Sequence, residues 1–315
     1  MPKLLICSHF TAWIAVVALS VWAWWTPPIA DEPDWNALGV SRSESIVYRA
    51  DGARRLRLEV YRPSQTANGR DSARLRPAVL AIHGGSWIAG SMTAFRYDAG
   101  KLAVRLAQRG FVVAAVDYRL ARPHSPSWPA VVDDLSEAVR WLRRHSTEYG
   151  IDPDRIAVMG QSSGGHLAAL LGTLPESRGP DGVSSRVQAI IDLYGPSDLA
   201  GLMSFRRLTH EPARSLLGDA VSRSTKLTAQ ASPLEHVTAD TPPTLLIHGD
   251  DDAWVPLDQS VRMAQALDRV GVLNKLIVIP GARHGFETAL EYPVKRDLLP
   301  EIIDFLERAW KRPIE

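Results

Sequence analysis

Residues 156–166, IAVMGQSSGGH, place two adjacent serines between glycines, directly after an apolar run. That run predicts a short buried strand, and residues 166–171 after the glycines predict a helix, so the glycines lie in a tight strand-to-helix turn. Neither phosphate-binding glycine pattern, G-x-x-x-x-G-K-[ST] or G-x-G-x-x-G, fits this stretch. The pattern that does fit is G-x-S-x-G, in which a sharp turn exposes a serine as a nucleophile.

The spacing of the glycines indicates which serine is the nucleophile. At such a turn the residues two before and two after the nucleophile crowd together, so both must be glycine or nearly as small. With Ser162 as the nucleophile these positions are Gly160 and Gly164, whereas Ser163 would place Gln161 at one of them. We therefore predict Ser162 as the nucleophile, with the backbone N–H of Ser163 at the helix start as an oxyanion donor.

The composition of the 315-residue chain is that of an ordinary globular protein, with 45% hydrophobic and 23% charged residues. The net charge of +1 and the absence of long runs of like charge indicate no nucleic-acid partner. The composition does not indicate an oligomeric state.

Residues 4–25 carry no formal charge and could cross a bilayer, which takes roughly 20 residues. Lys3 precedes this segment and acidic residues follow it, which favours a cytoplasmic N-terminus. We predict that residues 1–30 are a membrane anchor or a cleaved signal peptide, the anchor being favoured because tryptophans follow the best cleavage site. Either one places the remaining chain on the periplasmic or extracellular side. Cys7, the only cysteine, lies in this segment, so the exported part forms no disulfide.

Strands and helices alternate beyond a polar linker predicted at residues 31–43. Fully apolar strands separated by helices predict an α/β domain at residues 44–315, with a mostly parallel sheet covered by helices on both faces. The predicted strands are residues 45–49, 56–62, 77–83, 111–118, 156–159, 187–194, 244–248 and 275–279, and the predicted helices are 94–109, 130–145, 166–171 and 298–310.

Residues 198–240 interrupt the alternation. They contain several arginines and a polar patch, and no clear strand pattern. A long excursion between sheet strands is typical of a lid or a wall of a substrate site, and we expect one of these here.

A nucleophilic serine needs a base, usually a histidine that a carboxylate orients. After a G-x-S-x-G turn the expected chain order is serine, acid, histidine. His284 follows the last predicted sheet strand on a glycine-flanked loop and is the predicted base, whereas His166 and His248 are expected to pack in the interior. Three consecutive aspartates follow the strand at 244–248, and their position leaves all three open as the acid: Asp250, Asp251 and Asp252.

The oxyanion requires backbone N–H donors fixed in advance. Residues 83–87, HGGSW, follow a predicted strand and present Gly84, Gly85 and Ser86. A Gly-Gly pair after a strand is also common in simple turns, so its significance depends on the other site residues.

From about residue 47 to the C-terminal helix the chain resembles the α/β-hydrolase superfamily. Within it the similarity is to the esterase branch of BD-FAE and hormone-sensitive-lipase-like carboxylesterases, through HGGSW, VDYRL, YGIDPDRIAVMGQSSGGHLAALL, PPTLLIHGDDDAWVP and GARHGF. The resemblance implies Ser162 as nucleophile, His284 as base and, through H-G-x-x-D-x-x-V-P, Asp252 as acid. It implies an oxyanion hole at Gly84 and Gly85, with Ser86 in place of the third glycine of H-G-G-G lipases.

These residues imply a serine carboxylesterase that hydrolyses short-chain or carbohydrate-linked esters, with no metal or cofactor. The expected partner is a small-molecule ester, and a membrane if the N-terminal segment is uncleaved. Two alternatives stay open. One is an arylformamidase-type amide hydrolase, against which export argues, and the other is a noncatalytic membrane-tethered binding protein on the same scaffold, against which the complete triad argues.

Overall fold

The computed structural model describes residues 33–64, 75–97, 102–122, 124–205, 207–286, 289–290 and 296–311. The chain divides into two units, Met1–Asp34 and Trp35–Glu315, and the fold below is that of the second unit. The predicted anchor or signal peptide at residues 1–30 lies outside the described residues. Within the described ranges, no helix has both the length and the apolar character needed to cross a bilayer.

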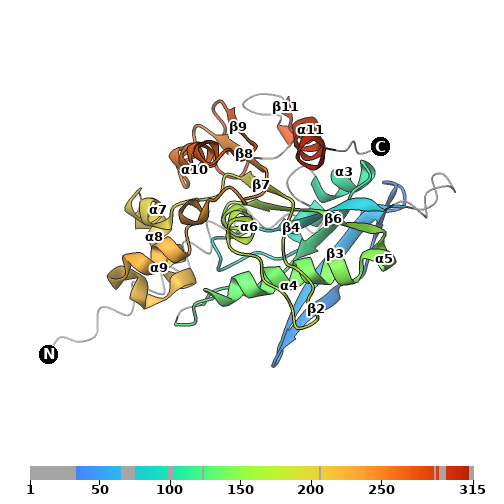
Figure 1. Ribbon diagram of the computed structural model, residues 1–315, viewed down its shortest axis with the longest axis horizontal. Helices are drawn as coiled ribbons and strands as arrows, with labels where there is room; N and C mark the ends of the chain where they lie inside the picture. The colour runs from blue at the N-terminus through green and yellow to red at the C-terminus, as the bar shows by residue number, and fades with distance from the viewer. Residues whose placement is uncertain are drawn as a thin grey trace. The chain divides into compact units, whose positions relative to one another are not determined.

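A nine-stranded, mostly parallel sheet forms the centre of the described fold (Figure 1). Its order is β1-β3-β5-β4-β6-β7-β8-β9, and β2 forms a hairpin with β3. All neighbours from β5 to β9 are parallel, whereas β3 pairs antiparallel with β1, β2 and β5. The strands are β1 Val40–Arg42, β2 Ile46–Asp51, β3 Arg54–Pro63, β4 Arg76–Ile82, β5 Val112–Val116, β6 Ile151–Gln161, β7 Ala189–Leu193, β8 Thr244–Gly249, β9 Asn274–Ile279, and a separate pair, β10 Ala289–Leu290 and β11 Arg296–Asp297.

Helices cover both faces of the sheet, which confirms the predicted architecture. On one face lie α3 (Leu102–Gln108) and α11 (Leu299–Trp310), and on the other lie α4 (Ala130–Arg144), α6 (Ser163–Thr173) and α10 (Asp258–Arg269). Two short helices, α2 (Ala94–Tyr97) and α5 (Ser146–Tyr149), belong to the connections. Because neither face meets solvent there, residues 77–82 of β4 and all of β5 are apolar at consecutive positions rather than at alternate ones.

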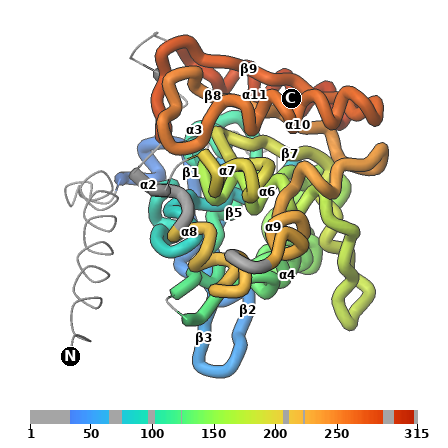
Figure 2. Tube along the Cα trace, turned by 90° about the vertical axis from the view of Figure 1, so that its left-hand side faces the viewer, coloured from blue at the N-terminus to red at the C-terminus, as the bar shows by residue number. Residues whose placement is uncertain are grey.

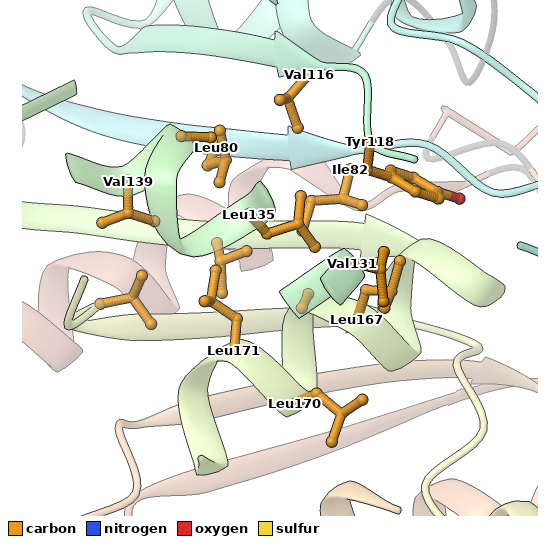
Figure 3. Close-up of a cluster of buried hydrophobic side chains, with 14 of the residues drawn as sticks. Leu80, Ile82, Val116, Tyr118, Val131, Leu135, Val139, Leu167, Leu170 and Leu171 are labelled. Atoms are coloured by element: carbon orange, nitrogen blue, oxygen red, sulfur yellow. The ribbon is translucent and has the colours of Figure 1, made fainter. Parts of the chain in front are cut away.

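The alternation of side chains along a strand divides the core into two layers. In β4, Val79 and Ala81 join the cluster under α3 and α11, while Leu80 and Ile82 join the cluster under α4 and α6. Figure 3 shows side chains of the second cluster, in which strand residues meet residues of both helices: Leu80, Ile82, Val116, Leu135, Val139, Leu167 and Leu171.

The sheet begins earlier in the chain than the sequence predicts. Val40 is fully buried, β1 lies within the stretch predicted as a linker, and Trp35 packs edge-on against Tyr61 with 5.7 Å between ring centroids. Strand β6 likewise begins at Ile151 rather than at residue 156. In both cases polar neighbours conceal the strand pattern, because β1 is an edge strand and residues 152–155 lie at the end of the sheet, where side chains meet solvent.

Residues 198–240 form a helical excursion between β7 and β8, with no strand among those that the structure describes. Its elements are α7 (Leu199–Phe205), α8 (Arg207–Leu217), η3 (Asp219–Arg223), α9 (Thr225–Gln230) and η4 (Pro233–His236), which gather on one side of the sheet (Figures 1 and 2). Its two ends are joined: the N–H of Leu199 donates to Ser232 Oγ, and the N–H of Leu234 donates to Ser197 O. The excursion is therefore a loop closed at its base.

Leu135→Ala should lower the free energy of unfolding by about 2–5 kcal/mol, because Leu135 is fully buried between α4 and the sheet and its loss leaves a cavity. Leu273→Ala is the matched control, since Leu273 is 48% exposed, and it should change stability by about 0.5 kcal/mol or less. Urea denaturation of both variants measures the difference. Equal losses would contradict the packing described here.

Candidate active site

Ser162 occupies the turn between β6 and α6 in a strained backbone conformation, with φ 53° and ψ −121°. A Cβ on Gly160 would lie 2.1 Å from Gly164 O, and a Cβ on Gly164 would lie 2.2 Å from Ile82 O. Both positions therefore require glycine, as the sequence predicts for a turn centred on Ser162. Strain of this kind costs roughly 1–3 kcal/mol and is typical of functional sites.

The structure brings Ser162, His284 and Asp252 together in one hydrogen-bonded series. His284 Nε2 lies 2.8 Å from Ser162 Oγ, and His284 Nδ1 lies 2.7 Å from Asp252 Oδ2. The Asp252 side chain is 1% exposed and that of His284 is 20% exposed, so the carboxylate is enclosed while the imidazole borders the cleft. The second oxygen of Asp252, Oδ1, accepts the backbone N–H groups of Trp254 and Val255 at 2.8 and 2.9 Å.

Asp250 and Asp251 have other contacts. Asp250 accepts the N–H of Gly281, and Asp251 forms an exposed ion pair with Arg283 at 3.1 Å. Of the three consecutive aspartates, Asp252 is the one that meets His284.

The electrostatics of the site keep Asp252 ionised. Burial alone would raise the pKa of this carboxyl, but hydrogen bonds from His248, His284 and the Val255 N–H outweigh it and hold the pKa well below its usual range. Asp252 is therefore an acceptor at neutral pH, so Nδ1 of His284 carries the proton and Nε2 faces the Ser162 hydroxyl.

His248 contacts the same carboxylate, which the sequence analysis did not anticipate. Its Nε2 lies 3.3 Å from Asp252 Oδ2 and 2.9 Å from Val255 O, and its Nδ1 lies 2.7 Å from Ser260 Oγ. His248 and Asp252 are four residues apart in the sequence. This spacing does not predict a contact by itself, because the contact depends on the path of the loop between them.

His166 packs in the interior, as the sequence predicts, and also connects separate parts of the site. Its Nε2 lies 2.7 Å from Ala231 O, so this nitrogen carries the proton, and Nδ1 accepts the indole N–H of Trp87 at 3.1 Å. Burial lowers the pKa of His166 to about 4, which keeps the ring neutral. Trp87, the helix of the nucleophile and the end of the helical excursion are thereby tied together.

The HGGSW loop passes directly against the nucleophile turn. A Cβ on Gly84 would lie 3.0 Å from Gln161 O, and a Cβ on Gly85, where φ is 121°, would lie 2.2 Å from Ala89 O. Ser86 continues the loop at a positive φ of 55° and borders the same cleft as Ser162 and Ser163.

No acceptor within the described residues binds the backbone N–H groups of Gly85 and Ser86. Ser163 is the first residue of α6, where a backbone N–H has no partner within the helix. The predicted oxyanion residues Gly84, Gly85, Ser86 and Ser163 thus surround Ser162, and three of them can offer N–H groups.

A cleft of about 370 Å³, including its open mouth, lies above these residues. Its apolar walls are formed by Trp87, Pro196, Leu202, Pro212, Trp254 and Val255. Leu202 and Pro212 come from α7 and α8, so the excursion at 198–240 forms part of the wall, as the sequence predicts.

The comparisons with known proteins point to esterases. The BD-FAE family model matches residues 58–267. Esterase LipC of Mycobacterium tuberculosis is 33% identical over 228 residues, which are 67% of this chain and 53% of LipC. Ethyl acetate hydrolase of Pseudomonas putida is 33% identical over 276 residues, covering 82% of this chain and 77% of that enzyme.

Among solved structures, a truncated carbohydrate esterase from gut microbiota superposes with a TM-score of 0.70 at 25% identity, covering 86% of this chain and 97% of that one. The chain spans about half the length of several curated relatives that it matches, LipC included.

Between about pH 6.5 and pH 4, acidification should remove the stability contributed by His83 and His166, because burial lowers the pKa of both to about 4, while buried Asp192, whose pKa burial raises to about 6, offsets part of this loss. In this window the unfolded chain binds protons that the folded chain does not, so stability falls as the pH falls. Over the whole window each histidine contributes about 3 kcal/mol to this loss. His166→Gln should remove the contribution of His166 to this loss. His124→Gln, at a side chain that is 83% exposed, should leave the dependence of the free energy of unfolding on pH unchanged. Denaturation curves at several pH values measure it, and equal slopes for the two variants would contradict the buried neutral state of His166.

Proposed function

Because the chain belongs to the BD-FAE family of α/β-hydrolase esterases, we propose that it is a serine carboxylesterase whose nucleophile is Ser162. His284 is the general base and Asp252 the carboxylate that orients it. The observation that carries this proposal is the hydrogen-bonded series from Ser162 Oγ through His284 to Asp252, with 2.8 and 2.7 Å between the bonded atoms.

In the first half of the reaction, Ser162 Oγ attacks the ester carbonyl carbon while its proton passes to His284 Nε2. The carbonyl oxygen becomes an anion, which the backbone N–H groups of Gly85, Ser86 and Ser163 hold. The bond to the alcohol oxygen then breaks, the alcohol takes the proton from His284, and an acyl group remains on Ser162.

In the second half, a water molecule gives its proton to His284 Nε2 and attacks the acyl carbon. The second tetrahedral intermediate collapses, Ser162 Oγ recovers the proton, and the carboxylic acid leaves. The ionised Asp252 stabilises the charged imidazole in both halves, since it accepts the Nδ1 hydrogen throughout.

The substrates that we propose are esters of short acyl groups, on simple alcohols or on carbohydrates. The cleft beside Ser162 is narrow and its walls are mostly apolar, which favours a small acyl group. The similarity to ethyl acetate hydrolase supports short acyl groups, and the structural neighbour described as a carbohydrate esterase supports sugar esters. A panel of p-nitrophenyl esters, acetylated xylan, methyl ferulate and N-formylkynurenine separates these substrates from formamides.

Ser162→Ala should abolish nearly all hydrolysis of p-nitrophenyl acetate, with a loss of about 10⁶ in kcat, while the thermal midpoint stays close to that of the parent. Ser163→Ala is the matched control: its backbone N–H is retained, so its kcat should fall far less. A large loss of kcat in Ser163→Ala together with a small loss in Ser162→Ala would instead identify Ser163 as the nucleophile.

Asp252→Asn should lower kcat by about 10⁴, because the amide cannot stabilise the imidazolium or select the same tautomer of His284. Asp251→Asn is the control, since Asp251 is 61% exposed and pairs with Arg283 instead. Steady-state kinetics of both variants give the comparison. A larger loss in Asp251→Asn would remove Asp252 from the assignment.

A further inference from the structure

His248 is a buried polar side chain that the mechanism above does not use. It is the second-last residue of β8, is fully buried, and lies four residues before Asp252. Its ring contacts three groups: Asp252 Oδ2 at 3.3 Å, Val255 O at 2.9 Å and Ser260 Oγ at 2.7 Å. Any buried imidazole needs polar partners, and what distinguishes His248 is that one of the groups it contacts is Asp252.

The partners of the ring determine which of its nitrogens donates. The Val255 carbonyl and the ionised Asp252 carboxylate are both acceptors only. The hydrogen that faces them is therefore on Nε2 of His248. In the neutral ring Nδ1 is then an acceptor, and the Ser260 hydroxyl of α10 donates to it. Ser260 is 1% exposed, so water does not compete for this bond.

The Nε2–H of His248 restrains the position of the Asp252 carboxylate from the interior of the protein. Asp252 Oδ1 is held by two backbone N–H groups, while Oδ2 is the oxygen that His284 and His248 share. The same N–H holds the carbonyl of Val255, whose side chain lines the cleft. One imidazole therefore fixes both the carboxylate and the loop that carries a wall of the substrate site.

We propose that His248 is a positioning residue for the esterase reaction: its Nε2–H bonds Val255 O and also faces Asp252 Oδ2 at 3.3 Å, and so keeps the carboxylate aligned with His284. This inference rests on the proposed function, since it concerns the same acid and base. Ser260 holds the ring of His248 in the required tautomer. The resulting chain of side chains runs from Ser260 through His248, Asp252 and His284 to Ser162.

Two amide substitutions distinguish the role of Nε2 of His248 from that of Nδ1. In His248→Gln the amide nitrogen can reach the place of Nε2, whereas in His248→Asn it can reach only the place of Nδ1. With p-nitrophenyl acetate, His248→Asn should lower kcat about 10- to 100-fold with KM nearly unchanged, because the bond to Val255 O and the polar contact with the buried carboxylate are both lost. His248→Gln should restore most of that loss. Equal kcat values for the two variants, whether high or low, would overturn the inference.

The second test asks whether His248 acts through Asp252. In an Asp252→Asn background, the further change His248→Asn should cost less than about 3-fold in kcat, because the carboxylate that it positions is already absent. A purely structural role predicts that the two losses multiply. Multiplication of the losses would therefore contradict the proposed role.

The third test needs no turnover. The His284 Nδ1 hydrogen that bonds Asp252 should give a far-downfield proton NMR resonance, which His248→Asn should shift and His248→Gln should return towards its original position. If His248→Asn does not fold, Ser260→Ala replaces it and should shift the same resonance by a smaller amount. An unchanged resonance overturns the positioning role even where Ser162→Ala abolishes activity. Full activity of Ser162→Ala would instead overturn the proposed function, and the inference with it.

Discussion

The close approach of Gly160 and Gly164 is the constraint on which the rest of the site depends. A Cβ at the first would lie 2.1 Å from the carbonyl of the second, so the turn exists only because neither residue has a side chain. This turn holds Ser162 at φ 53° and lets α6 begin directly behind the hydroxyl. Gly164 also lies against Ile82 O, which brings the end of β4 and the HGGSW loop beside the same serine. Strain at one residue thus places the Ser162 hydroxyl beside the backbone N–H groups of the HGGSW loop.

The parallel sheet assembles the remaining groups from distant parts of the chain. β4, β6, β8 and β9 end on the same edge, and each is followed by one part of the site: the HGGSW loop, Ser162, Asp252 and His284. Ligand sites of open α/β sheets lie at this carboxyl edge because the loops that leave it are free to vary while the strands stay paired. His284 and Ser162 are 122 residues apart in the chain, yet their side chains are hydrogen-bonded.

Much of this arrangement could be predicted from the sequence, since glycine spacing, apolar runs and chain order are local patterns. Ser162, the order of strands and helices, and the loop position of His284 all follow from such patterns. Local position could not choose Asp252 over Asp250 and Asp251, because that choice depends on where the loop after β9 lies, and the resemblance supplied it. The contacts of His248 could not be predicted either. A histidine at the end of a buried strand has the pattern of a packing residue, and its bonds form only when residues 249–255 curve back over it.

The joined ends of residues 198–240 have a consequence for how such an enzyme changes over evolution. Leu199 bonds Ser232 and Leu234 bonds Ser197, so the helical excursion leaves and re-enters the sheet at almost the same point. The free energy of closing a loop depends only weakly on its length, so helices can be gained, lost or exchanged above that neck while β7 and β8 remain paired. Leu202 and Pro212, which line the cleft, belong to the excursion, whereas Ser162, Asp252 and His284 lie outside it in the chain. The part of the cleft wall that the excursion supplies can therefore vary in sequence and length while the sheet that carries Ser162, Asp252 and His284 keeps its strand pairing.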